Sequence, residues 1–476
     1  MTPRLRAAPP ETPPRVAPGA MTAEGVGTVD LDTIVNLDDL ERAAERVMDK
    51  QDFDYFAGGA LPSPATPASS ETARARPAIP SRRPTPRDRP RPPDVPPRSE
   101  PSRAGAETET TLRANAAAYA SVRLWPRCLV DVSDVDTRCA IPSLGLRHLA
   151  APLIVAPVAM QKMAHPDGEC AAARACASAG IAYCASQQST TPVERIRDEG
   201  GDGVRWFQLY VLRDRDATAE LVRRAEAMGA VALVVTVDAP TLGRRERDVR
   251  NRFRLKRGLS LANVAKDDAR PVAAPNAEPE SKSESETVPS PSSPSGIDRR
   301  PTNASRAQSA IARRIGNRDA SLTWSVVPWL RTITTLPVIL KGVVTREDAR
   351  LAVEAGADGV WVSNHGGRQL DGAPATLEAL PEVVAGTRGR VPVIFDGGVR
   401  RGADCLKAIS AGADLVAFGR PVAWGLACGG EAGVAKAAEI LVEELATAMA
   451  LAGTPNVDAI RRERPARRVG APTAKL

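Results

Sequence analysis

The sequence predicts an α/β fold, a (β/α)8 barrel, from three observations. Eight short apolar runs of strand length alternate with amphipathic helical segments along the chain. The runs are almost continuously hydrophobic, which is typical of parallel strands that are buried on both faces. Ala-Gly pairs recur where a helical segment gives way to a strand, and glycine is the expected residue at a helix end. A doubly wound sheet is the alternative, but its GxGxxG fingerprint is absent from the sequence.

The barrel strands are predicted from apolar runs that are bounded by turn residues. Thr345 and Asp348 have the spacing of a capping box, which predicts that a helix begins directly after the fifth strand. The eight predicted strands are residues 153–158, 182–187, 204–211, 231–238, 337–343, 359–365, 392–398 and 415–421.

A helical extension is predicted before the barrel. Residues 31–60 carry apolar side chains at helical spacing, and Gly58 and Gly59 are expected to end the helix. Residues 1–25 are rich in proline, alanine and arginine without periodicity, so this N-terminus is predicted to be disordered. Residues 26–476 are accordingly interpreted as one barrel domain with its extension.

Two polar inserts interrupt this domain. Residues 61–106 contain 13 prolines in 46 positions, and residues 266–303 contain seven prolines and a run rich in serine and glutamate. Such compositions lack the apolar side chains that a packed core needs. Both inserts are therefore predicted to be disordered.

Composition argues against several classes of protein. The net charge is +7, but nine arginines lie within residues 61–106, and only 3% of the chain is aromatic, so nucleic acid is not an expected partner. No apolar run approaches the roughly 18 residues that a membrane helix needs, so no membrane insertion is expected. Seven scattered cysteines and three histidines favour a reducing compartment with no disulfide framework and no metal site.

Polar side chains collect at the carboxyl ends of the predicted strands. In a (β/α)8 barrel these ends and the loops after them form the active-site face. Any one of these side chains has a structural explanation, such as a helix cap or a solvated surface group, but their convergence favours a site. They are Gln208, Tyr210, Thr236, Asp238, Lys341, Ser363, Asp396 and Arg420.

The loop within residues 359–372, GVWVSNHGGRQLDG, carries the most informative pair. His365 transfers protons near neutral pH, and Arg368 presents a planar fork that fits a carboxylate. Two glycines between them allow backbone angles closed to other residues. The pattern favours a site for an anionic substrate.

The last two strands predict a phosphate site. FDGGVRRG and AFGRP combine glycines, which let backbone N–H groups approach an anion, with arginines that neutralise it. Barrels frequently bind phosphate after the seventh and eighth strands. A second enzyme class, a barrel isomerase or dehydrogenase of a phosphorylated substrate, would share this feature.

Several long motifs resemble one family. These motifs are DFDYFAGG, APVAMQKMAHPDGE, FQLYV, TVDAPTLGRRERDVRNRF, LKGVVTREDARLAVEAGADGVWVSNHGGRQLDG, DGGVRRG and FGRP. The chain resembles the FMN-dependent α-hydroxy acid oxidases and dehydrogenases, particularly the plant-type glycolate oxidases. The resemblance implies a TIM barrel that binds FMN and oxidises an (S)-2-hydroxy acid, such as glycolate or lactate, to the 2-oxo acid. O2 is the expected acceptor, giving hydrogen peroxide; another acceptor, or a flavin-binding barrel without turnover, is the alternative.

The resemblance implies four catalytic residues. His365 would be the base, Asp238 would orient it, Tyr210 would contact the hydroxyl group, and Lys341 would face the N1/O2 edge of the flavin. The implied substrate-binding residues are Tyr55, Gln188, Tyr210, Arg245, His365 and Arg368. The implied FMN-binding residues are Pro157, Val158, Ala159, Ser186, Gln208, Thr236, Lys341, Ser363, Asp396, Gly397, Gly398, Arg400, Gly419 and Arg420.

Two positions depart from the family pattern, and the last three residues suggest a targeting signal. Val158 stands where the family often has threonine, and Gln188 stands where glycolate oxidase has a tryptophan in the pocket. Residues 474–476, Ala-Lys-Leu, are a variant of the Ser-Lys-Leu peroxisomal signal, with the cytoplasm as the alternative. The family further implies a homotetramer or homo-octamer.

Overall fold

The structure is a computed structural model that describes residues 29–58, 107–263 and 317–469. The N-terminal segment 1–25, both predicted inserts and the C-terminal tripeptide lie outside these described residues.

Eight parallel strands close into a barrel in the order β10-β11-β4-β5-β6-β7-β8-β9, which confirms the predicted fold class. All eight predicted strands are present, but most predicted carboxyl ends are wrong by two or more residues. The polar residues that follow each run leave the sheet and enter the loops of the site. The strands are β4 (Leu153–Val155), β5 (Ala182–Ser186), β6 (Arg205–Leu209), β7 (Ala230–Thr236), β8 (Val338–Val343), β9 (Gly359–Val362), β10 (Val393–Asp396) and β11 (Leu415–Phe418).

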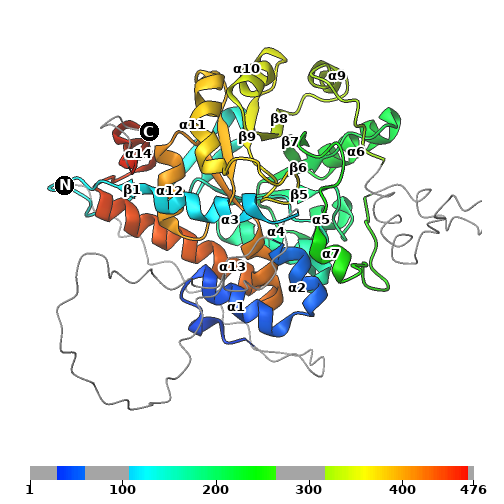
Figure 1. Ribbon diagram of the computed structural model, residues 1–476, viewed down its shortest axis with the longest axis horizontal. Helices are drawn as coiled ribbons and strands as arrows, with labels where there is room; N and C mark the ends of the chain where they lie inside the picture. The colour runs from blue at the N-terminus through cyan, green and yellow to red at the C-terminus, as the bar shows by residue number, and fades with distance from the viewer. Residues whose placement is uncertain (1–28, 59–106, 264–316, 470–476) are drawn as a thin grey trace, which may run out of the picture.

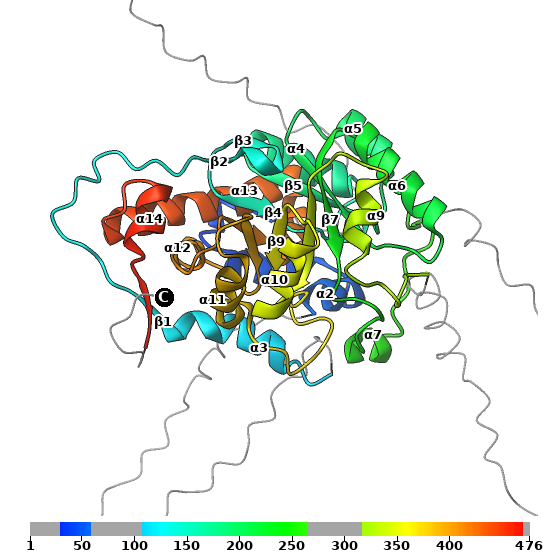
Figure 2. The same ribbon diagram turned by 90° about the horizontal axis from the view of Figure 1, so that it is seen from above.

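Helices surround the barrel, as the views in Figures 1 and 2 show. The predicted cap after the fifth strand is present, since the Asp348 N–H donates to Thr345 Oγ1 at 3.1 Å. One long helix is kinked where Gly429 and Gly430 leave helical angles. The surrounding helices are α4 (Gly168–Ser178), α5 (Val193–Glu199), α6 (Arg215–Ala227), α9 (Val326–Arg331), α10 (Arg346–Glu354), α11 (Thr376–Thr387), α12 (Gly402–Ser410) and the kinked α13 (Arg420–Ala452).

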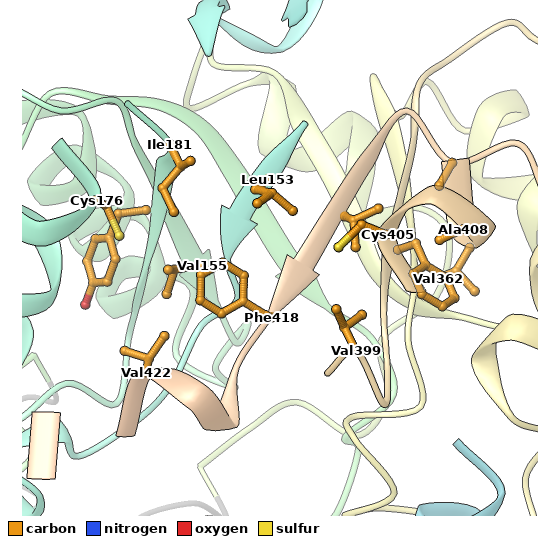
Figure 3. Close-up of a cluster of buried hydrophobic side chains, with 14 of the residues drawn as sticks. Leu153, Val155, Cys176, Ile181, Val362, Val399, Cys405, Ala408, Phe418 and Val422 are labelled. Carbon is orange, nitrogen blue, oxygen red and sulfur yellow. The ribbon is translucent and has the colours of Figure 1, made fainter. Parts of the chain in front are cut away.

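The core has two layers. Inside the barrel, Trp206 and Trp361 are fully buried with their rings 6.2 Å apart. Between the barrel and its helices, outward-facing strand residues such as Val155 and Phe418 pack against helix residues such as Val422 (Figure 3). Bulky apolar side chains on both faces of each strand account for the continuous hydrophobic runs in the sequence.

Short elements close the amino ends of the strands, and two of them, β1 (Val122–Leu124) and β12 (Ala466–Arg468), form an antiparallel pair. The antiparallel pair β2 (Cys139–Ile141) and β3 (Leu146–Leu149) packs on the inner core, and the Trp206 indole donates to the Leu144 carbonyl at 3.2 Å. The remaining elements are α3 (Thr110–Ala117), η2 (Ala118–Ser121), η3 (Pro142–Leu144), η4 (Gln161–Met163), α7 (Glu246–Arg250) and α14 (Val457–Glu463). Among the described residues, no helix has the length and apolar character to cross a membrane.

The N-terminal extension is helical but not one helix. The predicted helical extension is present up to Gly58 and consists of η1 (Leu31–Thr33), α1 (Leu37–Val47) and α2 (Lys50–Ala57). Asn36 caps α1 by accepting from two backbone N–H groups at 2.9 Å each.

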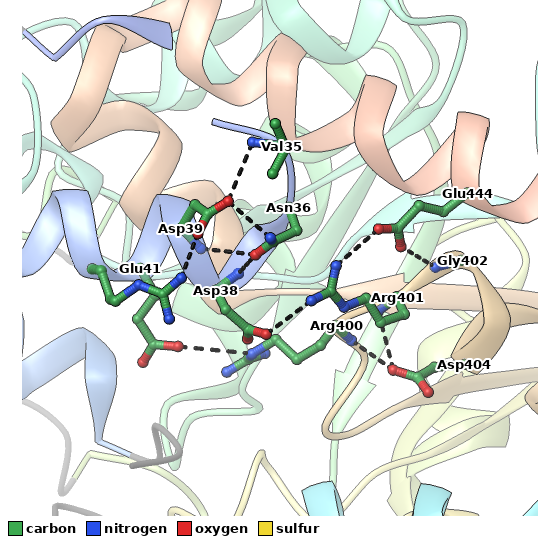
Figure 4. Close-up of polar contacts among 11 residues, drawn as sticks. Val35, Asn36, Asp38, Asp39, Glu41, Arg400, Arg401, Gly402, Asp404 and Glu444 are labelled. Atoms are coloured by element: carbon green, nitrogen blue, oxygen red, sulfur yellow. Dashed lines mark hydrogen bonds and ion pairs between the residues drawn. The ribbon is translucent and has the colours of Figure 1, made fainter. Parts of the chain in front are cut away.

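A polar cluster fixes α1 to the barrel (Figure 4). Arg401 pairs with Asp38 of α1 at 3.2 Å and with Glu444 of α13 at 3.1 Å. The extension is thereby attached beside the loop that follows β10, at the active-site face.

Candidate active site

One large cavity opens at the carboxyl ends of the barrel strands. Its empty space, including the open mouth, is about 1320 Å³. Polar and charged side chains from several strand ends converge on this cavity, which is typical of a ligand-binding site. All predicted site residues line the cavity except two, Asp238 and Ser363, which lie directly behind lining residues and bond to them.

His365 and Asp238 form the central pair. His365 Nδ1 lies 2.8 Å from Asp238 Oδ1, although 127 residues separate them in sequence. Burial lowers the pKa of His365, and Asp238 opposes this shift. The carboxylate holds the proton on Nδ1, which leaves Nε2 as the unprotonated nitrogen. The imidazole is thus arranged to accept a proton from a ligand in the cavity.

A glycine makes room for this pair. Gly342 follows Lys341 in β8 and has φ +113°, a region that side chains rarely adopt. A Cβ atom there would lie 2.5 Å from the Cβ atom of Asp238. Gly342 was not among the predicted site residues, because a single glycine in an apolar strand has no motif.

Lys341 is a buried cation held by two acceptors. Its ammonium donates to Ser363 Oγ at 2.8 Å and lies 3.2 Å from Asp396. Burial disfavours the charge, but Asp396 and then Asp238 outweigh it, so the pKa of Lys341 is raised. Trp361 donates to Asp396 at 2.9 Å and fixes the carboxylate from the barrel interior. The ammonium therefore remains positive in the cavity floor.

Three neutral side chains form a chain of hydrogen bonds along the floor. The Ser186 hydroxyl donates to Gln208 Oε1 at 3.2 Å, and Gln208 Nε2 donates to Thr236 Oγ1 at 3.0 Å. They come from the ends of β5, β6 and β7, which are neighbours in the barrel. Such a row of neutral donors and acceptors suits the polar edge of a planar heterocycle.

Two guanidinium groups and an aromatic stack form the opposite wall. Arg368 donates to the Tyr55 carbonyl at 2.7 Å and lies 5.0 Å from the centre of the Tyr55 ring. The Tyr55 ring stacks on Phe253 at 4.6 Å, with the planes 13° apart. Arg245 lines the same wall, 3.9 Å from Asp248. Burial, then the nearby charge of Arg245, lowers the pKa of Arg368 to about 10. An anion bound between the two guanidinium groups would relieve this repulsion.

The predicted phosphate cradle lies after β10 and β11. Arg400 Nε and Arg420 Nε are buried and have no hydrogen-bond partner among the described residues. Burial, then the neighbouring charges of Arg368 and Arg400, lowers the pKa of Arg420 to about 9. Gly397 and Gly398 have φ of 121° and 74°, and both line the cavity. Mutually repelling cations with free N–H groups fit a phosphate.

The extension reaches both ends of the cavity. Tyr55 of α2 belongs to the anion-binding wall, and the Gly58 carbonyl accepts a hydrogen bond from Arg420. Glu41 of α1 lies behind the cradle, 3.9 Å from Arg400. Burial raises the pKa of Glu41 to about 7, against the opposing effect of Arg400 and Arg420. Sequence reasoning did not single out Glu41, because a glutamate in an amphipathic helix reads as a surface residue.

The residues present fit FMN. A buried cation, a row of neutral hydrogen-bonding groups and a cationic cradle lie in one continuous cavity, in the order that an isoalloxazine edge and a phosphate would require. Val158, which stands at a position where the family resemblance suggests threonine, lines the cavity with an aliphatic side chain and offers no hydrogen bond to FMN.

Comparisons with known proteins agree with this geometry. The family model of the FMN-dependent dehydrogenases matches residues 100–467. The chain is 45% identical to glycolate oxidase 3 of Arabidopsis thaliana over 359 residues, covering 75% of this chain and 88% of the relative. It is 44% identical to glycolate oxidase of Spinacia oleracea with the same coverage.

Solved structures show the same architecture. Mandelate oxidase with (S)-4-hydroxymandelic acid aligns with a TM-score of 0.69 and 39% identity, covering 90% of this chain and 98% of the other. Mandelate oxidase with benzoyl-formic acid aligns with a TM-score of 0.67 and 38% identity at the same coverage. With its cavity, its cation arrangement and these similarities, the chain belongs to the FMN-dependent dehydrogenase family.

Proposed function

We propose that this protein is an (S)-2-hydroxy-acid oxidase that uses FMN and O2. The observation that carries the proposal is that His365, backed by Asp238, faces the same cavity as Arg245 and Arg368. A base beside two guanidinium groups suits a substrate that carries a hydroxyl group next to a carboxylate. The overall reaction converts the 2-hydroxy acid and O2 into the 2-oxo acid and hydrogen peroxide.

The side chains divide the work by position. Arg368 and Arg245 hold the substrate carboxylate, and Tyr55 closes over it from the extension. Tyr210 contacts the hydroxyl group. Positioned in this way, the α-hydroxy carbon unit lies against His365, whose Nε2 accepts a proton while Asp238 stabilises the resulting positive charge.

The cofactor is held by the rest of the cavity. Bound FMN supplies the two-electron acceptor. Lys341 would place a fixed positive charge beside the flavin ring, supported by Ser363 and Asp396. Ser186, Gln208 and Thr236 would hydrogen-bond the ring, and the backbone of residues 157–159 would contact it. Gly397, Gly398, Arg400, Gly419 and Arg420 would hold the ribityl chain and phosphate.

The test is the colour of the purified protein and its response to substrate. The protein should be yellow, and anaerobic glycolate or lactate should bleach it. Colourless protein that cannot be reconstituted with FMN would contradict the assignment. Flavin that stays oxidised with every 2-hydroxy acid would indicate a binding protein without turnover. If the bleached flavin reoxidises slowly in air but rapidly with an artificial acceptor, the protein is a dehydrogenase and not an oxidase.

We further propose that the protein is a peroxisomal homotetramer or homo-octamer. The support is the Ala-Lys-Leu tripeptide at residues 474–476 and the family resemblance. A fluorescent protein fused at the N-terminus, which keeps Leu476 last, should give peroxisomal puncta, and residues added after Leu476 should disperse them. Puncta that survive the addition would exclude this address. Light scattering after size exclusion measures the assembly.

A further inference from the structure

Arg318 is a third guanidinium group in the wall of the active-site cavity. It precedes α9 in a segment where sequence analysis predicted no site residue. Its side chain lines the cavity, yet the residue is only 7% exposed. The guanidinium stacks on the Tyr210 ring, 3.5 Å from the ring centre, and Nη1 donates to the Ala239 carbonyl at 3.3 Å. Arg318 is therefore fixed against a residue proposed to contact the substrate.

Arg318 forms no direct ion pair within the part of the chain that the structure describes. No carboxylate among the described residues forms an ion pair with it, and its buried Nε has no hydrogen-bond partner there. Burial lowers the pKa of Arg318; Tyr210 and Asp238 oppose this shift, and the nearby charge of Arg245 adds to it. A buried charge is costly unless it is paired, and arginine stays charged under physiological conditions. The guanidinium therefore keeps hydrogen-bonding capacity that an anion in the cavity would satisfy.

The cations of the cavity exceed the needs of a substrate with one carboxylate. Arg245 and Arg368 together suffice to clamp one carboxylate. Lys341 is occupied by Asp396 and Ser363. Arg318 remains, on the face of Tyr210 and close enough to Arg245 for mutual repulsion. A second anionic group on the ligand would relieve that repulsion.

We propose that Arg318 is a specificity-determining residue that binds a second carboxylate, so that the substrates include 2-hydroxy dicarboxylic acids. The proposal rests on the proposed function and adds the chemical class of the substrate's far end. One carboxylate occupies the clamp beside His365, and the other reaches Arg318 beyond Tyr210. The number of carbon atoms that best separates the two carboxylates is determined by comparing dicarboxylic acids of different length.

A purely structural role would have a different signature. Tyr210, Thr236 and Arg318 also line a second cavity outside the first, so the guanidinium stands in the wall between the two. If Arg318 only held Tyr210 in place, its removal would weaken ligands with one or two carboxylates equally. A loss confined to ligands with two carboxylates requires direct contact.

The test is calorimetric titration of the FMN-loaded protein with two probes of equal carbon number, 2-oxoglutarate and 2-oxopentanoate. The wild type should bind 2-oxoglutarate roughly 10–100-fold more tightly, as expected for a hydrogen-bonded ion pair. Arg318→Gln should abolish this preference while leaving the Kd of 2-oxopentanoate unchanged. Arg318→Lys should retain part of it, because the charge remains without the fork.

A matched control is Arg215→Gln. Arg215 also stacks on an aromatic ring, that of Trp329 at 4.8 Å, but lies outside the cavity. It should leave both Kd values unchanged. Equal affinity of the wild type for both probes, or equal weakening of both by Arg318→Gln and Arg318→Lys, would overturn the proposal.

Flavin reduction separates this proposal from the proposed function. Anaerobic (S)-2-hydroxyglutarate should bleach the wild type at lower concentration than (S)-2-hydroxypentanoate. If neither acid reduces the flavin but 2-oxoglutarate still binds preferentially through Arg318, the proposed oxidation fails and the second anion site stands. If both acids reduce it with equal efficiency, the site for a second carboxylate is refuted and the oxidase assignment stands.

Discussion

The two ends of the active-site cavity are built in different ways. At the phosphate end, Gly397, Gly398 and Arg400 follow one strand, and Arg420 follows the next strand in the barrel. At the substrate end, the functional groups come from parts of the chain that are far apart in sequence. His365 follows β9, Asp238 follows β7, and Tyr55 comes from the extension, some 300 residues earlier in sequence than His365.

One end of the cavity thus depends on residues close together in sequence, and the other on residues that only the complete fold brings together. The phosphate site is built mainly from two adjacent loops with glycines and arginines, and the extension adds only Glu41 and the Gly58 carbonyl behind them. The substrate end exists only if the barrel closes and the extension packs across its mouth. Variants at the two ends should therefore fail in different ways, by loss of FMN at one and by loss of turnover or substrate affinity at the other.

The largest expected effect is at the substrate end. His365→Gln should lower kcat by roughly 10²–10⁴-fold, the usual contribution of a positioned base, while FMN remains bound. Stopped-flow flavin reduction under saturating substrate measures it.

His148→Gln is the matched control, because His148 is an exposed histidine on β3, away from the cavity. It should reduce flavin at the wild-type rate. Near wild-type flavin reduction by His365→Gln would contradict its role as the base. Loss of FMN from this variant would contradict the separation of substrate-binding and FMN-binding residues.

A smaller effect should follow from Arg368→Lys. One ammonium group cannot replace a planar fork, and the bond to the Tyr55 carbonyl is lost as well, so KM should rise roughly 10–100-fold. Steady-state kinetics with glycolate and lactate measure the change. Arg350→Lys, an exposed pair to Glu354, should leave KM unaltered. An unchanged KM in Arg368→Lys would remove this arginine from the carboxylate clamp.

The phosphate end is tested by Arg400→Gln. FMN affinity should fall roughly 10-fold or more, because a charge-assisted contact to the phosphate is lost, whereas KM of the reloaded enzyme should stay near wild type. Quenching of FMN fluorescence during reconstitution gives the Kd. The adjacent Arg401→Gln is the control, since Arg401 pairs with Asp38 and Glu444 outside the cavity. Equal loss of FMN in both variants would show that the effect is structural.

The smallest expected effect concerns substrate size. Gln188 lines the cavity two residues after Ser186, where an indole in related enzymes takes more space. Gln188→Trp should shift kcat/KM toward glycolate relative to longer 2-hydroxy acids by ~1–3 kcal/mol, the value of about one methylene group. Gln188→Ala should shift the ranking in the opposite direction. If neither substitution changes the ranking, position 188 does not set specificity.

The barrel and most of the cavity could be predicted because their signals are local. Continuous apolar runs identify parallel strands, and residues directly after them must meet at one face of a closed barrel. The strand ends were overestimated because residues 156–158, which are apolar, and residues 363–365, which are polar, follow the strand runs without a turn signal but lie in loops in the fold. The helical extension was also predicted from its periodicity, but the break between α1 and α2 at Met48 and Asp49, which have extended or irregular backbone, gave no signal in the sequence.

Some functional residues gave no signal in the sequence. Trp361 reads as a core residue of a strand, and only the fold shows that its indole fixes Asp396. Arg318 lies in a stretch without a motif, and its importance depends on the Tyr210 ring that tertiary packing brings to it. Groups that act through a partner distant in sequence are invisible to pattern and spacing alone.

Because the extension contributes to the lining of the cavity, it limits where the protein can be truncated or fused to another protein. The family model begins at residue 100, but Glu41, Tyr55 and Gly58 precede that boundary and contact the cavity residues. A fragment chosen by the family boundary would keep the whole barrel and lose part of its catalytic centre. A functional fusion or transplant of this enzyme therefore needs residues 29–58 together with the barrel.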